Sequence, residues 1–111
     1  MINTEFIFKK NQDYLIKCIG KNMKYKGKYI LGFCTCKHSL VCLDNIAKHS
    51  KQKDMINNLV YVITHEAIES LLIGLGDIQS CDKMTCRLIG QPVLDIKHNC
   101  LYMEKKEAIA I

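Results

Sequence analysis

The feature that most constrains this chain is a long apolar segment, residues 58–75, that carries three ionisable side chains. Nearly every position from 59 onward is apolar, and the exceptions include His65, Glu66 and Glu69. A run of this length is typical of a helix, and glycines at positions 74 and 76 supply its stop. Because a helix that is apolar on nearly every side needs partners all round, we expect it to lie buried within the domain.

The size and composition fit one domain, residues 1–111. The chain has 111 residues, of which 49% are hydrophobic, so a single core can form. No apolar run reaches the roughly 18 residues that a membrane span requires. The N-terminus lacks the apolar stretch and cleavage site of a signal peptide. We therefore expect a cytoplasmic protein with no membrane partner.

The remaining segments predict a small α+β domain around the apolar helix. A short β-hairpin or antiparallel sheet is expected to pack on this long central helix. The other predicted elements, in chain order, are a strand at residues 5–8, an N-terminal helix at 11–24, hairpin strands at 29–36 and 40–43, a second helix at 77–88, and short C-terminal strands at 93–96 and 100–103.

Helical geometry groups the three ionisable side chains. At about 100° per residue, Glu69 lies about 40° from His65 on the same face, and Glu66 lies on the neighbouring flank. HExxH helices bind zinc in this way, with the intervening Glu as general base. Two buried carboxylates would repel, and no Lys or Arg lies between Met55 and Asp82, so a divalent cation would satisfy both. The alternative is that both carboxylates face solvent and His65 is a hydrogen-bonded core histidine.

Residues 29–75 resemble the minimal zincin core of small HExxH metalloprotease domains. In that core a strand, a hairpin edge strand and a connector precede the active helix. The matching segments are YILGF at residues 29–33, SLVCL at 39–43 and LVYVITHE at 59–66. The resemblance covers under half of the chain and implies a small zinc-dependent, peptidase-like hydrolase.

The resemblance also assigns roles to individual residues. His65 becomes the first metal ligand, Glu66 the general base that activates water, and Glu69 takes the place of the second His. A carboxylate there lowers the charge of the metal site and can shift its preference from Zn²⁺ toward Mn²⁺ or Fe²⁺. The third ligand comes from downstream of the helix, and Asp82 is the first choice. The reserves are Asp77, Cys81, Cys86 and His98.

In this family the edge strand next to the active helix holds an extended peptide substrate by strand addition. The resemblance therefore implies that Leu40, Val41 and Cys42 bind substrate. A peptide is the partner that this site would take.

Seven cysteines are many for an intracellular chain, and their odd number leaves at least one thiol unpaired within it. Cys34, Cys36, His38 and Cys42 form a cluster that could bind zinc, although its spacing differs from a standard zinc knuckle. A three-residue hairpin loop would place Cys36 opposite Cys42, within reach of a disulfide, whereas a two-residue loop would not. Buried thiols are a further explanation. The Lys- and Ile-rich composition suits a thermophilic source, where intracellular disulfides are common.

The sequence therefore leaves three functions open. The first is a small metal-dependent hydrolase, and the second is a non-catalytic descendant of the same fold. The third is a basic nucleic-acid-binding module stapled by disulfides, because eleven of the sixteen basic residues lie between Lys9 and Lys53. A solvated lysine-rich surface explains this charge as well, and the single Arg argues against sequence-specific binding. The sequence sets no oligomeric state.

Overall fold

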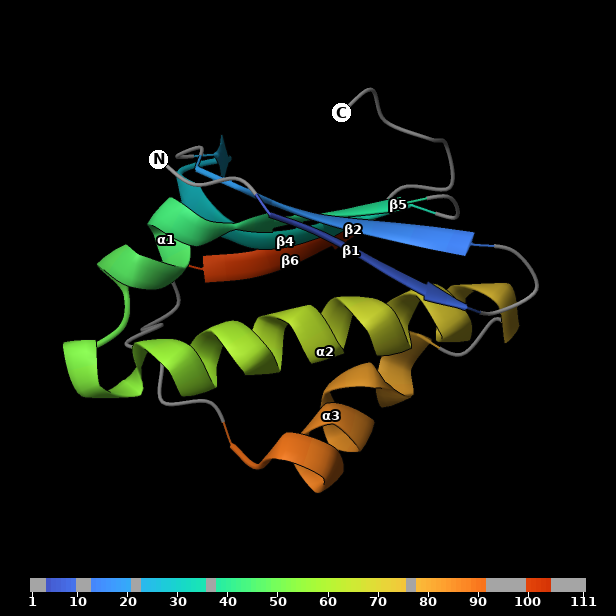
Figure 1. Cartoon of the computed structure of the whole chain (residues 1–111). Coiled ribbons are helices and arrows are strands. Elements are labelled where there is room, and N and C mark those ends of the chain that lie inside the picture. Colours follow the sequence, from blue (N-terminus) through green and yellow to red (C-terminus); the bar gives the residue numbers. More distant parts are fainter. Residues whose placement is uncertain are drawn as a thin grey trace.

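A mixed β-sheet and a long helix form the two main layers of this small α+β domain, as expected (Figure 1). The computed structural model describes residues 4–9, 13–20, 23–35, 38–75, 78–91 and 100–104. Helix α2 (Met55–Leu75) packs against the sheet, and α3 (Cys81–Ile89) packs on α2. The remaining elements are β1 (Thr4–Lys9), β2 (Asp13–Ile19), β3 (Lys24–Tyr25), β4 (Lys28–Cys34), β5 (His38–Cys42), α1 (Leu43–Lys48), the 3-10 helices η1 (Gln52–Asp54) and η2 (Ile78–Ser80), and β6 (Cys100–Glu104).

The strands lie in the order β1-β2-β5-β4-β3, with β6 also paired to β4. The neighbours β1–β2, β5–β4 and β4–β3 are antiparallel, whereas β2–β5 and β4–β6 are parallel. The sheet is therefore mixed rather than antiparallel. The C-terminal strand expected at residues 100–103 is present as β6, and the one expected at 93–96 lies outside the described residues.

The expected N-terminal helix at residues 11–24 is wrong, because this segment contains strand β2. Tyr14, Ile16 and Cys18 are all buried and face α2, which is the alternation of a strand. The apolar residues of this segment fit helical spacing equally well, so its sequence alone permits both structures. Pairing with β1 on one side and β5 on the other selects the strand.

The hairpin between β4 and β5 is confirmed, but its turn lies earlier than expected. The Thr35 N–H donates to the carbonyl of His38 at 2.9 Å, and Cys34 pairs with Ser39. In this register Gly32 lies opposite Val41, so Cys42 lies at the far end of the hairpin from the turn. Cys36 lies outside the described residues, and Cys42 is a buried free thiol. The register that a three-residue loop would need to place Cys36 opposite Cys42 is therefore not formed.

Strand β5 is an interior strand, and the expectation that it binds a peptide at a sheet edge is wrong. It is hydrogen-bonded to β2 on one side and to β4 on the other. Its residues Leu40, Val41 and Cys42 are buried. With its backbone groups already paired, β5 cannot accept a further strand.

Helix α2 buries most, but not all, of its circumference. Tyr61 and Val62 join the core against the sheet, whereas Leu72 packs in a smaller cluster with Cys81 of α3. The outer side leaves Ile56 exposed by 70%, with Val60 and Leu71 exposed by 42% and 44%. Burial on every side was therefore too strong an expectation. No described helix is long and apolar enough to span a membrane.

Candidate metal centre

Helix α2 directs its three ionisable side chains into the interior. His65, Glu66 and Glu69 are exposed by only 3%, 0% and 4%. The alternative in which both carboxylates face solvent is therefore wrong. Burial of two carboxylates one helical turn apart is unfavourable unless they are protonated, hydrogen-bonded or bound to a cation.

Strand β4 makes room for Glu66 by having no side chain at Gly32. A Cβ atom added at Gly32 would overlap Oε1 of Glu66. The β4–β6 register shifts at this point, between Ile30 and Gly32, and pairs Gly32 with Tyr102. The Tyr102 ring stacks on His65, with ring centroids 3.8 Å apart. The sheet and helix thus enclose His65 and Glu66 from both sides.

One nitrogen of His65 has a well-defined partner. Its Nε2 lies 2.9 Å from Oδ1 of Asp82, and the Tyr61 hydroxyl donates to the same oxygen at 3.2 Å. Burial lowers the pKa of His65, although Asp82 acts in the opposite direction. A neutral imidazole that donates its Nε2–H to Asp82 satisfies this contact and leaves Nδ1 with a free lone pair.

That lone pair faces two carboxylates. Nδ1 of His65 lies 3.6 Å from Oε2 of Glu66 and 3.7 Å from Oε2 of Glu69. These separations are too long for hydrogen bonds. They fit ligands of one zinc ion, because atoms at about 2.1 Å from a tetrahedral ion lie about 3.4 Å apart. Burial, and then the charge of Glu69, raise the pKa of Glu66 well above its ordinary value.

Cys81 completes a possible ligand set. Ligand atoms of His65, Glu69 and Cys81 lie within 4.8 Å of one another, and all three residues are buried. The Cys81 thiol donates to the backbone carbonyl of His65 at 3.2 Å. Burial, followed by Glu69, raises its pKa to about 12, so metal binding here would release a thiol proton. Sequence reasoning held Cys81 only as a reserve ligand.

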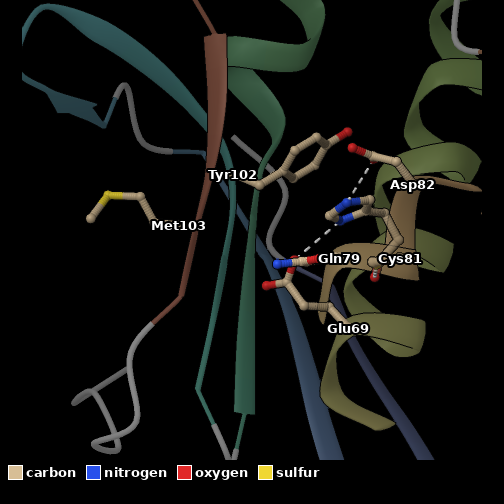
Figure 2. Close-up of a pocket in the computed structure, with 7 residues that line it drawn as sticks. Glu69, Gln79, Cys81, Asp82, Tyr102 and Met103 are labelled. Carbon is tan, nitrogen blue, oxygen red and sulfur yellow. Dashed lines mark hydrogen bonds and ion pairs between the residues drawn. The ribbon is translucent and has the colours of Figure 1, made fainter. Parts of the chain in front are cut away.

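The structure places Asp82 differently from the expected third ligand. Its side chain is 69% exposed, and its Oδ1 contacts Nε2 of His65. Glu69 instead approaches Nδ1 of the same ring. One ion bound at Nδ1 therefore cannot also reach Asp82 with the side chains as they stand. Asp82 and Glu69, both labelled in Figure 2, thus approach different nitrogens of His65. This arrangement is typical of a carboxylate that orients a metal-binding histidine.

A pocket of about 400 Å³ opens beside these residues. Its lining includes His65 and Glu69 from α2, Cys81 and Asp82 from α3, and Tyr102 from β6 (Figure 2). The pocket gives a small molecule or a side chain access to the buried cluster.

A second ligand set shares Glu69 with the first. Ligand atoms of Cys34, Glu66 and Glu69 also lie within 4.8 Å of one another. Cys34 belongs to the core that faces α2, whereas Cys42 belongs to the core on the other sheet face. The expected zinc cluster of Cys34, Cys36, His38 and Cys42 is therefore divided by the sheet. Gly32 and Cys34 are two residues apart on a strand and therefore share a face. This spacing could have indicated that Cys34 lies near Glu66, but the sequence analysis did not use it.

No protein-family model, curated protein or solved structure matches this chain.

Proposed function

We propose that this protein is a small metal-dependent hydrolase of peptidase-like type, with Zn²⁺ held by His65, Glu69 and Cys81. The observation that carries the proposal is the approach of two buried carboxylates to the Nδ1 lone pair of His65, at 3.6 and 3.7 Å. Without a proton or a cation between them, these acceptor atoms would repel one another. A divalent cation would satisfy Nδ1 of His65 and the Glu69 carboxylate together.

The residues present fit such an ion. Nitrogen, carboxylate and thiolate together suit zinc, and Mn²⁺ or Fe²⁺ are alternatives that would use the nitrogen and carboxylate. Three protein ligands leave one position open, as catalytic zinc sites require, and the pocket lies beside them. The bound ion would supply a Lewis acid that polarises a carbonyl.

Glu66 is the proposed general base. It lies beside His65, and its raised pKa moves it toward the range in which a carboxylate accepts protons from water. Asp82 would fix the tautomer of His65, and Tyr61 would in turn hold Asp82. An extended peptide remains the proposed substrate. Since β5 is paired on both sides, the peptide would use the pocket beside β6.

Metal analysis of the purified protein tests the proposal. We expect one equivalent of Zn²⁺ or more, and one equivalent fewer in a His65→Asn variant. His49→Asn is the matched control, because His49 contacts Asn45 and Tyr29 and belongs to neither ligand set. Glu66→Gln should keep an ion but abolish peptide hydrolysis. The absence of stoichiometric metal would refute the proposal, whereas bound metal with no Glu66 effect on any hydrolysis would favour a non-catalytic binding protein.

A specific surface favours a second candidate, the binding of single-stranded nucleic acid. The exposed β3–β4 hairpin carries Lys24, Lys26 and Lys28, and Lys24 Nζ lies 4.5 Å from the ring centre of Tyr29. Lys48 of α1 reaches the same ring at 4.4 Å. Basic and aromatic side chains together suit phosphates and bases. Binding that weakens steeply with salt would support this candidate, and the absence of binding at low salt would exclude it.

A further inference from the structure

Glu66 is a carboxyl group that helix α2 places in the interior of the domain. Its side chain is fully buried, and neither carboxylate oxygen has a hydrogen-bond partner among the residues that the structure describes. Its Oε2 lies 3.6 Å from Nδ1 of His65. Buried polar groups are nearly always paired, so this carboxylate calls for a ligand that the described part of the chain does not supply.

Cys34 offers a soft ligand, and its ligand atom lies within 4.8 Å of those of Glu66 and Glu69. The thiol is fully buried on β4 and belongs to the set Cys34, Glu66 and Glu69. The Tyr14 hydroxyl lies 3.2 Å from its Sγ, and that hydroxyl is itself anchored on Ser39 at 3.0 Å. Because the Tyr14 hydroxyl donates to the Thr35 carbonyl at 2.6 Å, it helps to fix the position of the thiol without donating to it.

The charges of the combined cluster match two divalent ions. In their ionised forms Glu66, Glu69, Cys34 and Cys81 carry four negative charges, and His65 is neutral. One divalent ion at His65, Glu69 and Cys81 balances two of these charges and leaves Glu66 uncompensated. A second divalent ion at Cys34 and Glu66 balances the remaining two negative charges. Such a balance of charge is favoured where the dielectric constant is low.

We propose that the chain has a second divalent-cation site, made by Cys34 and Glu66 with Glu69 shared between the two ions. Carboxylates commonly bridge ions about 3.5–4 Å apart in two-metal sites. This inference rests on the proposed function in one respect: the second ion binds the same carboxylate that serves as general base. Binding of the second ion therefore inhibits hydrolysis. The hydrolytic activity should rise with the first equivalent of zinc and fall with the second.

Native mass spectrometry with Zn²⁺ tests the second site without reference to activity. We expect two ions on the wild-type chain and one on a Cys34→Ala variant. Cys18→Ala is the matched control, because Cys18 is a buried free thiol of the same core but belongs to neither ligand set, and it should keep two ions. A Co²⁺ titration should show thiolate charge-transfer absorption that grows over two equivalents and over only one in Cys34→Ala.

The outcomes separate the two proposals. One ion on the wild type, unchanged by Cys34→Ala, overturns the second site and leaves the proposed function standing. No bound ion overturns both. If Cys34→Ala does not fold, Glu66→Gln carries the test: one ion on this variant and two on the wild type support the second site, and two ions on both overturn it.

Discussion

At the scale of single residues, the buried cluster depends on small details of fit. Gly32 leaves the space that the Glu66 carboxylate fills, and Asp82 occupies Nε2 of His65 so that Nδ1 faces the carboxylates. Neither detail is visible in the His-Glu-x-x-Glu pattern itself. Both can be tested by single substitutions.

A Gly32→Ala substitution should destabilise the protein by about 1–3 kcal/mol, because the added methyl group overlaps Oε1 of Glu66. Urea unfolding of the metal-free protein measures the change. In a Glu66→Ala background the space is free, so the same substitution should cost much less. An equal cost in both backgrounds would mean that Gly32 matters for another reason.

An Asp82→Asn substitution should weaken zinc binding by about 10–100-fold, because the histidine loses the carboxylate that orients it. Competition with a chromogenic chelator measures the affinity. Asp44→Asn, on α1 and outside both ligand sets, should leave the affinity unchanged. Loss of all zinc in Asp82→Asn would instead indicate a direct ligand.

At the scale of elements, α2 is the helix that the sequence predicts, but its two long sides differ. One side packs against the sheet and α3, and the other leaves Ile56, Val60 and Leu71 exposed. Helix α3 brings Cys81 and Asp82 to the site, so the site depends on the packing of α3 against α2.

A Leu72→Ala substitution should cost about 2–5 kcal/mol, because Leu72 is buried with Ile68 and Cys81 between α2 and α3. Its sequence neighbour Leu71 is 44% exposed, and Leu71→Ala should change stability by less than about 1 kcal/mol. Chemical unfolding compares the two variants. Equal effects would contradict this packing of α3.

At the scale of the whole molecule, the buried carboxylates link folding to pH and to metal. The folded state holds the Glu66 proton more tightly than the unfolded chain, whose Glu has an ordinary pKa near 4.5. Stability contributed by this protonated form is complete below that value. It is lost as the pH rises from there toward the raised pKa of the folded state.

Metal-free protein should therefore lose stability as the pH rises above about 4.5, by at most about 1.4 kcal/mol per pH unit for one such group. Thermal unfolding in the presence of a chelator measures this slope. Glu66→Gln should flatten it, and saturating Zn²⁺ should reverse it, because the ion binds the deprotonated ligands of the folded state. A wild-type slope that Glu66→Gln leaves unchanged would show that other groups cause it.

Much of the fold could be predicted from local pattern. The apolar run at 59–75 requires a long packed helix, the turn signals around position 37 predict a hairpin, and the spacing of His65 and Glu69 places both on one helix face. The segment containing Tyr14 and Cys18 was ambiguous, because its apolar residues satisfy both helical and strand periods. Only pairing with β1 and β5 resolved it.

What the sequence by itself determined is a mostly apolar helix at residues 59–75 with His65 and Glu69 on one of its faces. Helical periodicity is local, so one segment suffices to predict it. The tertiary structure decided which groups meet that helix. It brought Cys34 and Gly32 from β4, Tyr102 from β6, and Cys81 and Asp82 from α3. These contacts join distant segments, and sheet order and register, which set them, depend on the packing of the whole chain.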